Sequence, residues 1–190
     1  MLGLPKKNEN RIVFIGDSIT EEWGNLYPRF FANQGYINRE IGGQTTPQML
    51  LRFKPDAINL KPNVIVILAG TNDIAGNTGP SMVKMITDNI FYMAELAINK
   101  KIKIILSSIL PVHNYPWNLS IKNVPSNISS INVLIKDYAV RNKMVYLDYY
   151  SLMVDKNKGL DIGYTKDGVH PNKTGYELMS NIATKILSKI

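Results

Sequence analysis

Short apolar runs alternate along the chain with longer segments in which apolar residues recur at helical spacing. Each apolar run ends in a turn signal, as expected where a strand gives way to a loop. The pattern predicts five strands, at residues 11–15, 36–40, 64–69, 103–107 and 144–147. The third and fourth runs are continuously apolar, which indicates burial on both faces. Strands that alternate with helices predict an α/β fold, a parallel sheet sandwiched between helices.

Four segments carry the apolar stripe of an amphipathic helix. Two are residues 81–99 and 130–142, and a third opens at Thr46 before Pro47, a cap followed by the first helical residue. The last runs from about residue 172 to the end of the chain. The residues that we expect to face the sheet are Met82, Ile86, Ile90, Met93, Ala97, Ile131, Leu134, Ile135, Tyr138, Ala139, Met49, Leu50, Phe53, Leu178, Ile182, Ile186 and Ile190.

The longest stretch without a periodic pattern covers residues 111–126 and follows the fourth predicted strand. A loop of this length at the carboxyl end of a parallel strand is expected to shape a ligand site. No repeat, linker or low-complexity tract divides the 190 residues. We therefore expect one domain over residues 1–190, with residues 1–10 as an N-terminal extension.

Charge and composition exclude several classes of protein. Without cysteine the chain has no disulfide, no thiolate metal site and no cysteine nucleophile. The net charge of +7 comes from scattered lysines, which indicates a solubilising surface, with a polyanion-binding face as the alternative. No apolar run is long enough to cross a bilayer, and the first residues lack the pattern of a secretory signal. We expect a soluble protein, cytoplasmic or, with a signal removed, periplasmic or secreted.

Two turns far apart in the sequence hold the three residue types that activate a hydroxyl. Ser18 follows the first predicted strand, and Asp167 and His170 share a turn near the end of the chain. An imidazole accepts the hydroxyl proton, and a carboxylate holds the imidazole. The alternatives are structural: Ser18 opens a capping box that ends at Glu21, and the other two residues are then a loop aspartate and a surface histidine.

Acyl transfer also needs hydrogen-bond donors for the oxygen that becomes negative. Two candidate segments follow the second and third predicted strands, at residues 42–45 and 70–73. Gly43 allows close approach of a backbone N–H group to a ligand, and Asn72 offers a side-chain amide. Ordinary strand-exit turns, which favour glycine and asparagine, are the alternative.

These motifs, Gly16-Asp17-Ser18, Gly43, Gly70-Thr71-Asn72-Asp73 and Asp167-Gly168-Val169-His170-Pro171, resemble those of the SGNH hydrolases, also called GDSL-type esterases and lipases. The resemblance covers nearly the whole chain, with Ile19 where the family usually has leucine. It implies a flavodoxin-like three-layer α/β/α sandwich with a five-stranded parallel sheet.

The same resemblance implies the roles of the site residues. Ser18 is the nucleophile, His170 the base and Asp167 the partner that orients it. The backbone N–H groups of Ser18 and Gly43 and the side-chain amide of Asn72 form the oxyanion hole. No metal and no organic cofactor is implied.

The implied activity is that of a carboxylic ester hydrolase acting through an acyl-serine. We expect short acyl esters such as acetylated carbohydrates, because no long apolar lid follows the nucleophile. Lysophospholipids and thioesters are alternatives at the same site. The expected partner is a small-molecule or carbohydrate ester and not nucleic acid, bound by a monomer or small homo-oligomer. The resemblance also favours export of the protein to the periplasm or beyond, because carbohydrate-trimming relatives often act there.

Further polar and aromatic residues near these motifs are candidate substrate contacts: Asp17, Tyr115 and Trp117. Asp17 and Asp73 also fit a role in bracing the loops. The aromatic pair fits either a platform for a sugar or acyl group, or a loop folded on its own side chains. His113, in the same loop, is left out of the triad because the Asp-x-x-His unit already supplies a base.

Two rival functions belong to other classes. A metal-dependent phosphoesterase also gathers Asp, Asn and His at strand ends, but only His113 and His170 are available, and neither lies in a recognisable metal-ligand pair. A non-catalytic binding module would use the basic surface for a polyanion or the Trp117 loop for a glycan.

Overall fold

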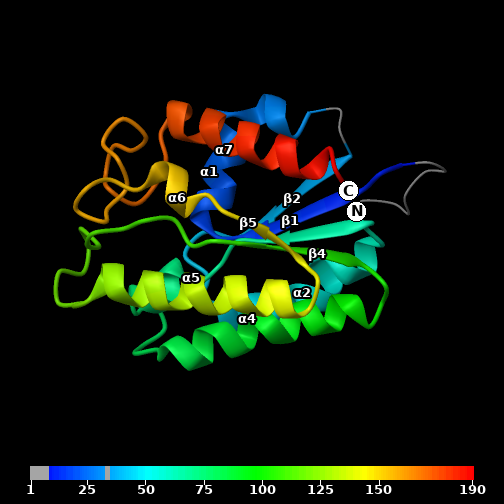
Figure 1. Cartoon of the computed structure of the whole chain (residues 1–190), viewed down its shortest axis with the longest axis horizontal. Helices are drawn as coiled ribbons and strands as arrows, with labels where there is room; N and C mark the ends of the chain where they lie inside the picture. Colours follow the sequence, from blue (N-terminus) through cyan, green and yellow to red (C-terminus); the bar gives the residue numbers. More distant parts are fainter. Residues whose placement is uncertain (1–8, 33–34) are drawn as a thin grey trace.

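The computed structural model describes residues 9–32 and 35–190, so most of the expected N-terminal extension lies outside the described residues. Five parallel strands form one sheet in the order β2-β1-β3-β4-β5 (Figure 1). The strands are β1 (Ile12–Gly16), β2 (Tyr36–Glu40), β3 (Val64–Ile67), β4 (Lys103–Ser107) and β5 (Val145–Leu147). The five predicted strands and the flavodoxin-like strand order are confirmed.

Helices cover both faces of the sheet, as Figure 1 shows. One face carries α2 (Thr46–Asp56), α4 (Val83–Ile98) and α5 (Val124–Arg141), and the other carries α1 (Ser18–Leu26) and α7 (Lys173–Leu187). Shorter elements are the 3₁₀ turns η1 (Pro28–Phe30) and η2 (Ile58–Leu60) and the helices α3 (Thr71–Ile74) and α6 (Tyr150–Met153). The arrangement is the expected three-layer α/β/α sandwich.

Two hydrophobic clusters lie on either side of the sheet. Along β1, Val13 and Ile15 belong to the cluster beneath α2, α4 and α5, whereas Ile12 and Phe14 belong to the cluster beneath α1 and α7. Successive side chains of a strand point to opposite faces, so both sets are apolar when both faces are covered. This burial explains why the central strands β1, β3 and β4 read as nearly continuous apolar runs.

Two helix starts differ from the prediction. Helix α5 begins at Val124, with Pro125 in its first turn, and the preceding irregular segment is therefore residues 108–123. Proline fits the first turn of a helix because a backbone N–H group there would have no partner within the helix. Residues 124–126 therefore belong to the helix and not to the loop. In α2 the cap is Thr45, and Thr46 is already helical.

Several residues expected to face the sheet do not. Met82 is 66% exposed, and Leu134 and Ile190 are also exposed. In α7 the buried face consists of Gly175, Tyr176, Met179, Ser180, Ala183 and Leu187, whereas Leu178, Ile182 and Ile186 are only partly buried. The prediction selected aliphatic residues, but the close packing of α7 on α1 favours small and aromatic ones: Ser180 accepts a hydrogen bond from the indole of Trp23 (2.9 Å).

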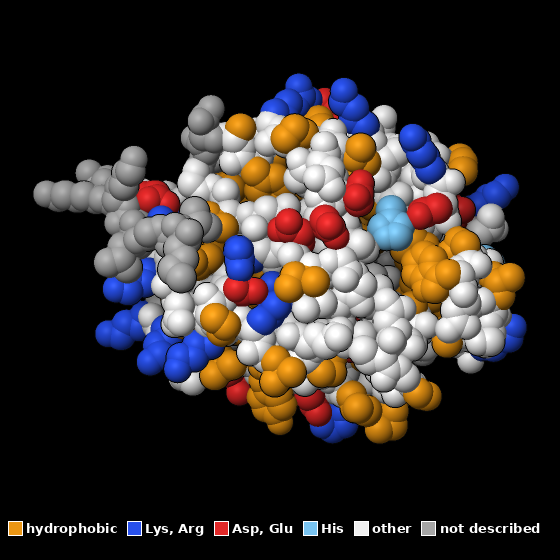
Figure 2. Space-filling view, turned by 180° about the vertical axis from the view of Figure 1, so that it is seen from behind, with side chains coloured by type: hydrophobic (Ala, Val, Ile, Leu, Met, Phe, Trp, Pro, Cys, Tyr) orange, Lys and Arg blue, Asp and Glu red, His pale blue; other side chains and the backbone are white. Residues whose placement is uncertain are grey.

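Two further features are the distribution of charged side chains on the surface and the apolar length of the helices. Figure 2 shows Lys and Arg side chains in several separate groups, most of them near the margins of one face, and a row of acidic side chains nearer its centre beside a histidine. Among the described residues, no helix is both long and apolar enough to span a bilayer.

Candidate active site

Ser18 is the first residue of α1 and lies at the carboxyl end of β1, near the middle of the sheet. The helix cap is the preceding residue: the carboxylate of Asp17 accepts a hydrogen bond from the Ile19 backbone N–H (3.0 Å). Capping by Asp17 satisfies a helix-end donor and leaves the Ser18 hydroxyl available for another partner. The alternative interpretation of Ser18 as the cap is therefore wrong.

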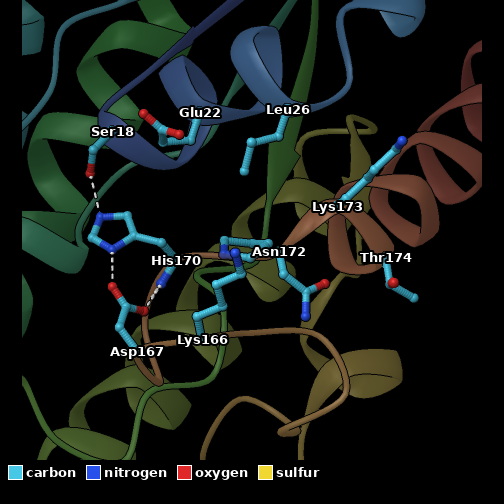
Figure 3. Close-up of a pocket in the computed structure, with 10 residues that line it drawn as sticks. Ser18, Glu22, Leu26, Lys166, Asp167, His170, Asn172, Lys173 and Thr174 are labelled. Atoms are coloured by element: carbon cyan, nitrogen blue, oxygen red, sulfur yellow. Dashed lines mark hydrogen bonds and ion pairs between the residues drawn. The ribbon is translucent and has the colours of Figure 1, made fainter.

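That partner is the imidazole from the other end of the chain. Ser18 Oγ lies 3.0 Å from His170 Nε2, although the two residues are 152 positions apart. On the far side of the ring, His170 Nδ1 lies 2.7 Å from Asp167 Oδ2 (Figure 3). The structure thus brings together the three residues expected to form the triad, in the order in which a base and its orienting carboxylate act on a hydroxyl.

The turn that carries Asp167 and His170 is stabilised by its own backbone. Asp167 Oδ1 accepts hydrogen bonds from the backbone N–H groups of Val169 (2.9 Å) and His170 (2.7 Å). Gly168 has a φ of +83°, a conformation that glycine adopts without strain. The Thr165 hydroxyl donates to the His170 carbonyl (2.7 Å). The imidazole is therefore held by a local network within a few residues of sequence.

The charge state of Asp167 suits its role. Partial burial alone would raise the pKa of this carboxyl, but hydrogen bonds from the His170 side chain and from the backbone of His170 and Val169 outweigh it, and the net pKa is lowered. A carboxylate that stays ionised accepts the hydrogen bond of the imidazole Nδ1 and so orients the ring. Both side chains remain partly open to solvent, at 43% for Asp167 and 30% for His170.

The glycine loop between β2 and α2 packs against the nucleophile turn. A Cβ placed on Gly42 would lie 3.8 Å from the Ser18 Cβ and only 2.5 Å from a carboxylate oxygen of Glu21. Gly43 has a φ of +75°, in the left-handed region. Among the described residues, the backbone N–H groups of Ser18 and Gly43 donate to no protein acceptor. Both remain available to a ligand oxygen.

Asn72, at the start of α3, is fixed against the same loop. Its amide nitrogen donates to the Gln44 carbonyl (3.0 Å), and its amide oxygen accepts from Asn77 Nδ2 (3.0 Å). Asn77 Nδ2 also donates to the Gly43 carbonyl (3.1 Å). These bonds set the orientation of the Asn72 amide and leave its second N–H free to donate. Asn77 was missed in the sequence because it lies outside every recognisable motif.

Two buried carboxyls, Asp17 and Asp73, stand behind these loops. Asp73 accepts from the backbone N–H (2.9 Å) and the hydroxyl (2.6 Å) of Thr46, which ties α3 to α2. Burial raises the pKa of Asp73, and burial raises the pKa of Asp17 to about 7. Asp17 is 1% exposed, so its expected contact with substrate is corrected: it braces the turn from inside.

The aromatic residues of the long loop have different positions. Tyr115 is fully buried, and its hydroxyl lies 3.0 Å from Thr71 Oγ1, so the expectation that it offers a binding surface is also corrected. Trp117 is half exposed, with its ring centroid 6.1 Å from that of His170 and 5.3 Å from that of Tyr115. His113 lines a separate cavity, where Nδ1 lies 3.1 Å from the Asn157 carbonyl.

A groove of about 690 Å³ opens beside the Ser18–His170 pair (Figure 3). Ser18, Glu22 and Leu26 of α1 form one wall. Residues 166–167 and 170–174 form the other. Its volume lies within the range typical of small-molecule sites. Among the residues that the structure describes, no group of three or more His, Cys, Asp or Glu side chains could hold a metal ion.

The fold is a flavodoxin-like three-layer α/β sandwich, and the hydrogen-bonded side chains of Ser18, His170 and Asp167 lie at the carboxyl edge of its sheet. Together these features define a class of three-layer α/β proteins with a hydrolase-type site. Within that class, the chain belongs to the GDSL-like Lipase/Acylhydrolase family, whose model matches residues 14–178. The family places the chain among the carboxylic ester hydrolases.

Three similar proteins extend this assignment. A GDSL-like lipase from Bacteroides thetaiotaomicron VPI-5482 is 48% identical with a TM-score of 0.97, over 99% of this chain and 92% of that one. A provisionally assigned acylhydrolase from Bacteroides fragilis NCTC 9343 is 50% identical with the same TM-score, over 99% of this chain and 91% of that one. An acetylxylan esterase from Xylanibacter ruminicola is 26% identical over 94% of this chain, which spans only 43% of that esterase's length.

Proposed function

We propose that the protein hydrolyses carboxylic esters through an acyl-enzyme on Ser18. The observation that carries the proposal is the continuous hydrogen-bonded series from Ser18 Oγ through the His170 ring to Asp167. A hydroxyl within 3.0 Å of an imidazole nitrogen is in reach of a base, and the carboxylate fixes the tautomer that presents the free nitrogen to Ser18.

In the proposed first step, His170 Nε2 accepts the proton of Ser18 as Oγ attacks the ester carbonyl. The developing oxyanion is bound by the N–H groups of Ser18 and Gly43 and by the free amide hydrogen of Asn72. His170 then gives its proton to the leaving alcohol, and the acyl group stays on Ser18. In the second step His170 takes a proton from the water that attacks the acyl-serine, and then gives this proton to Ser18 Oγ as the acid is released.

The proposed substrate is a short acyl ester of a polar alcohol, with an acetylated carbohydrate as the leading case. The groove lies on the His170 side of Ser18, where the leaving alcohol must receive its proton, and Glu22 and Lys173 on its walls can hydrogen-bond to hydroxyl groups. The half-exposed Trp117 ring offers a flat apolar face close to His170. The acetylxylan esterase that resembles this chain supports the same substrate class.

The direct test is turnover of a short-chain aryl acetate by wild type and by Ser18→Ala. We expect wild type to show saturable hydrolysis and Ser18→Ala to lose it. Ser130→Ala, which removes an exposed hydroxyl of α5 on the other face of the sheet, is the matched control and should retain full activity. Equal turnover by Ser18→Ala and wild type would refute the proposal.

A second assay separates the candidate substrates. Acetylated xylo-oligosaccharides, a lysophospholipid and an acyl thioester are compared at equal concentration. We expect the highest kcat/KM for the acetylated sugar. A preference for the long-chain lysophospholipid would leave the serine mechanism standing and contradict the proposed substrate class.

A further inference from the structure

Arg52 is a residue of α2 whose guanidinium lies at the carboxyl ends of β1 and β2. Its side chain is 11% exposed. Nη2 donates to the Gly16 carbonyl (2.9 Å), Nη1 donates to the Arg39 carbonyl (3.0 Å), and Nε donates to the side-chain oxygen of Gln44. Nη1 also forms an ion pair with Asp56 (3.2 Å), one helical turn further on. Outside its own helix, this largely buried cation therefore has acceptors on β1, on β2 and in the loop that follows β2.

Two of those segments adjoin the proposed oxyanion donors. Gly16 is two residues before Ser18, at the strand end that leads into the nucleophile turn. Gln44 directly follows Gly43, and its main-chain carbonyl accepts the hydrogen bond from the Asn72 amide (3.0 Å). The Arg52 guanidinium thus contacts, on one side, the turn that holds Ser18 and, on the other, the loop that holds Gly43 and orients Asn72.

The chemistry of these contacts requires arginine. A guanidinium presents five N–H donors in a rigid plane, whereas a lysine ammonium is a single point at the end of a flexible chain. Burial of Arg52 lowers its pKa, opposed by the ion pair with Asp56. A buried charge is costly unless it is paired and hydrogen-bonded, and Arg52 meets this requirement with acceptors that lie behind the candidate site.

We propose that Arg52 is a positioning residue that sets the distance between the Ser18 turn and the Gly43–Asn72 side of the oxyanion hole. This inference rests on the proposed function, because it assigns Arg52 a part in the same reaction. Arg52 does not touch the substrate. Its contribution is to hold donors where the oxyanion forms, and a small displacement of such donors lowers the rate of the chemical step.

Arg39 offers a matched control. Its guanidinium pairs with the other carboxylate oxygen of the same Asp56, and its side chain is 37% exposed. It donates neither to Gly16 nor to Gln44 among the described residues. Removing Arg39 deletes a cation from the same ion-pair network and leaves both site segments bonded to Arg52.

The test compares Arg52→Lys and Arg52→Met with Arg39→Met in steady-state hydrolysis of a short-chain aryl acetate. We expect both Arg52 variants to lose kcat by roughly 10-fold to 100-fold with KM changed by less than about threefold, since donor positions affect the transition state more than substrate binding. Arg39→Met should keep kcat within about threefold of wild type. Free guanidinium ion added to Arg52→Ala should restore part of kcat, because it refills the same site.

Gln44→Met keeps the inference testable where the Arg52 variants fail to fold. It removes only the side-chain acceptor of Arg52 Nε and leaves the main-chain bond to Asn72. We expect a loss of about threefold to tenfold in kcat at unchanged thermal stability.

Three results would overturn the inference: folded Arg52→Met with wild-type kcat, an equal loss in Arg39→Met, or Gln44→Met with wild-type kcat where both Arg52 variants are unfolded. Absence of ester hydrolysis in wild type is a different outcome. It refutes the proposed function itself, and the role of Arg52 falls with it.

Discussion

The two sides of Ser18 are built in different ways. On one side, Asp167 and His170 come from a single turn, are partly exposed, and are held mainly by bonds within a few residues of sequence. On the other side, Gly43 comes from the β2–α2 loop and Asn72 from α3, and their segments are joined by bonds between residues about 30 positions apart. The base side is therefore a local turn that leads into α7, whereas the donor side forms only when the folded sheet brings separate segments together.

This difference predicts different responses to mutation. A change on the base side should alter chemistry and leave stability nearly intact, because its side chains are exposed and bury little surface. A change on the donor side should alter both, because the hydrogen bond from Asn72 to Gln44 also joins α3 to the loop that leads into α2. The following variants test that contrast.

His170→Ala should have the largest effect on activity. Loss of the base should lower kcat for an aryl acetate by roughly 10⁴-fold or more, as removal of the histidine does in other serine hydrolases, while the melting temperature stays close to that of wild type. Steady-state kinetics and thermal unfolding measure the two quantities. His113→Ala, which changes the other histidine in a separate cavity, should retain activity. More than a tenth of wild-type activity in His170→Ala would contradict the role of His170.

Asn72→Ala should lower both activity and stability. Removal of one oxyanion donor costs roughly 10²-fold to 10³-fold in kcat. The same change leaves the Gln44 carbonyl without its partner, at a cost of about 1 kcal/mol in the free energy of unfolding. Kinetics and urea unfolding test the two effects together. A loss of kcat without any loss of stability would show that the donor side is not braced as the structure indicates.

Asp17→Asn should change how stability depends on pH. Burial holds the pKa of Asp17 at about 7 in the folded protein, above the ordinary value of 3.8, so the stabilisation it gives is complete below pH 4 and is lost as the pH rises through 7. Asparagine stays neutral and still accepts from the Ile19 N–H. The variant should therefore gain stability over wild type at pH 8, by roughly 4 kcal/mol, and nearly none at pH 4.

Urea unfolding at pH 4, 6 and 8 measures this effect. Asp137→Asn, on the exposed surface of α5, serves as the control and should show no such trend. An Asp17→Asn stability difference that is the same at all three pH values would show that burial does not raise the pKa of Asp17 in the folded protein.

Trp117→Ala should have the smallest effect. If the half-exposed ring contacts the alcohol part of the substrate, its removal should raise KM for an acetylated sugar by about threefold to tenfold and leave kcat little changed. Leu119→Ala removes an exposed apolar side chain from the same loop and is the control. Unchanged KM in Trp117→Ala would remove this ring from the proposed substrate site.

The contrast between the two sides also explains what could be predicted from the sequence. The central strands β1, β3 and β4 can be predicted because burial on both faces leaves a continuous apolar pattern, whereas the edge strands β2 and β5 are only partly buried and carry a weaker signal. The apolar face of α7 was misplaced because Ser180 and Ala183 do not look like core residues, although they allow the helix to approach Trp23. Likewise, a polar loop pattern did not reveal that Tyr115 is buried against Thr71.

The residues of the candidate site also divide into those that a sequence motif reveals and those that only tertiary contacts reveal. The Asp-x-x-His turn and Ser18 are recognisable because each is a short motif. Asn77 and Arg52 had no such signal: each is a polar residue whose importance depends on partners 5 to 36 positions away. Their roles arise from tertiary contacts, which a single sequence does not display.

The central claim is that Ser18 becomes acylated, and the most direct measurement is covalent labelling with an alkyl fluorophosphonate, followed by intact mass and peptide mapping. The account predicts one adduct per chain, located on Ser18, that forms in step with the loss of esterase activity and is absent from Ser18→Ala. Esterase activity that persists after Ser18 is fully modified, or an inactivating adduct on another residue, would contradict it.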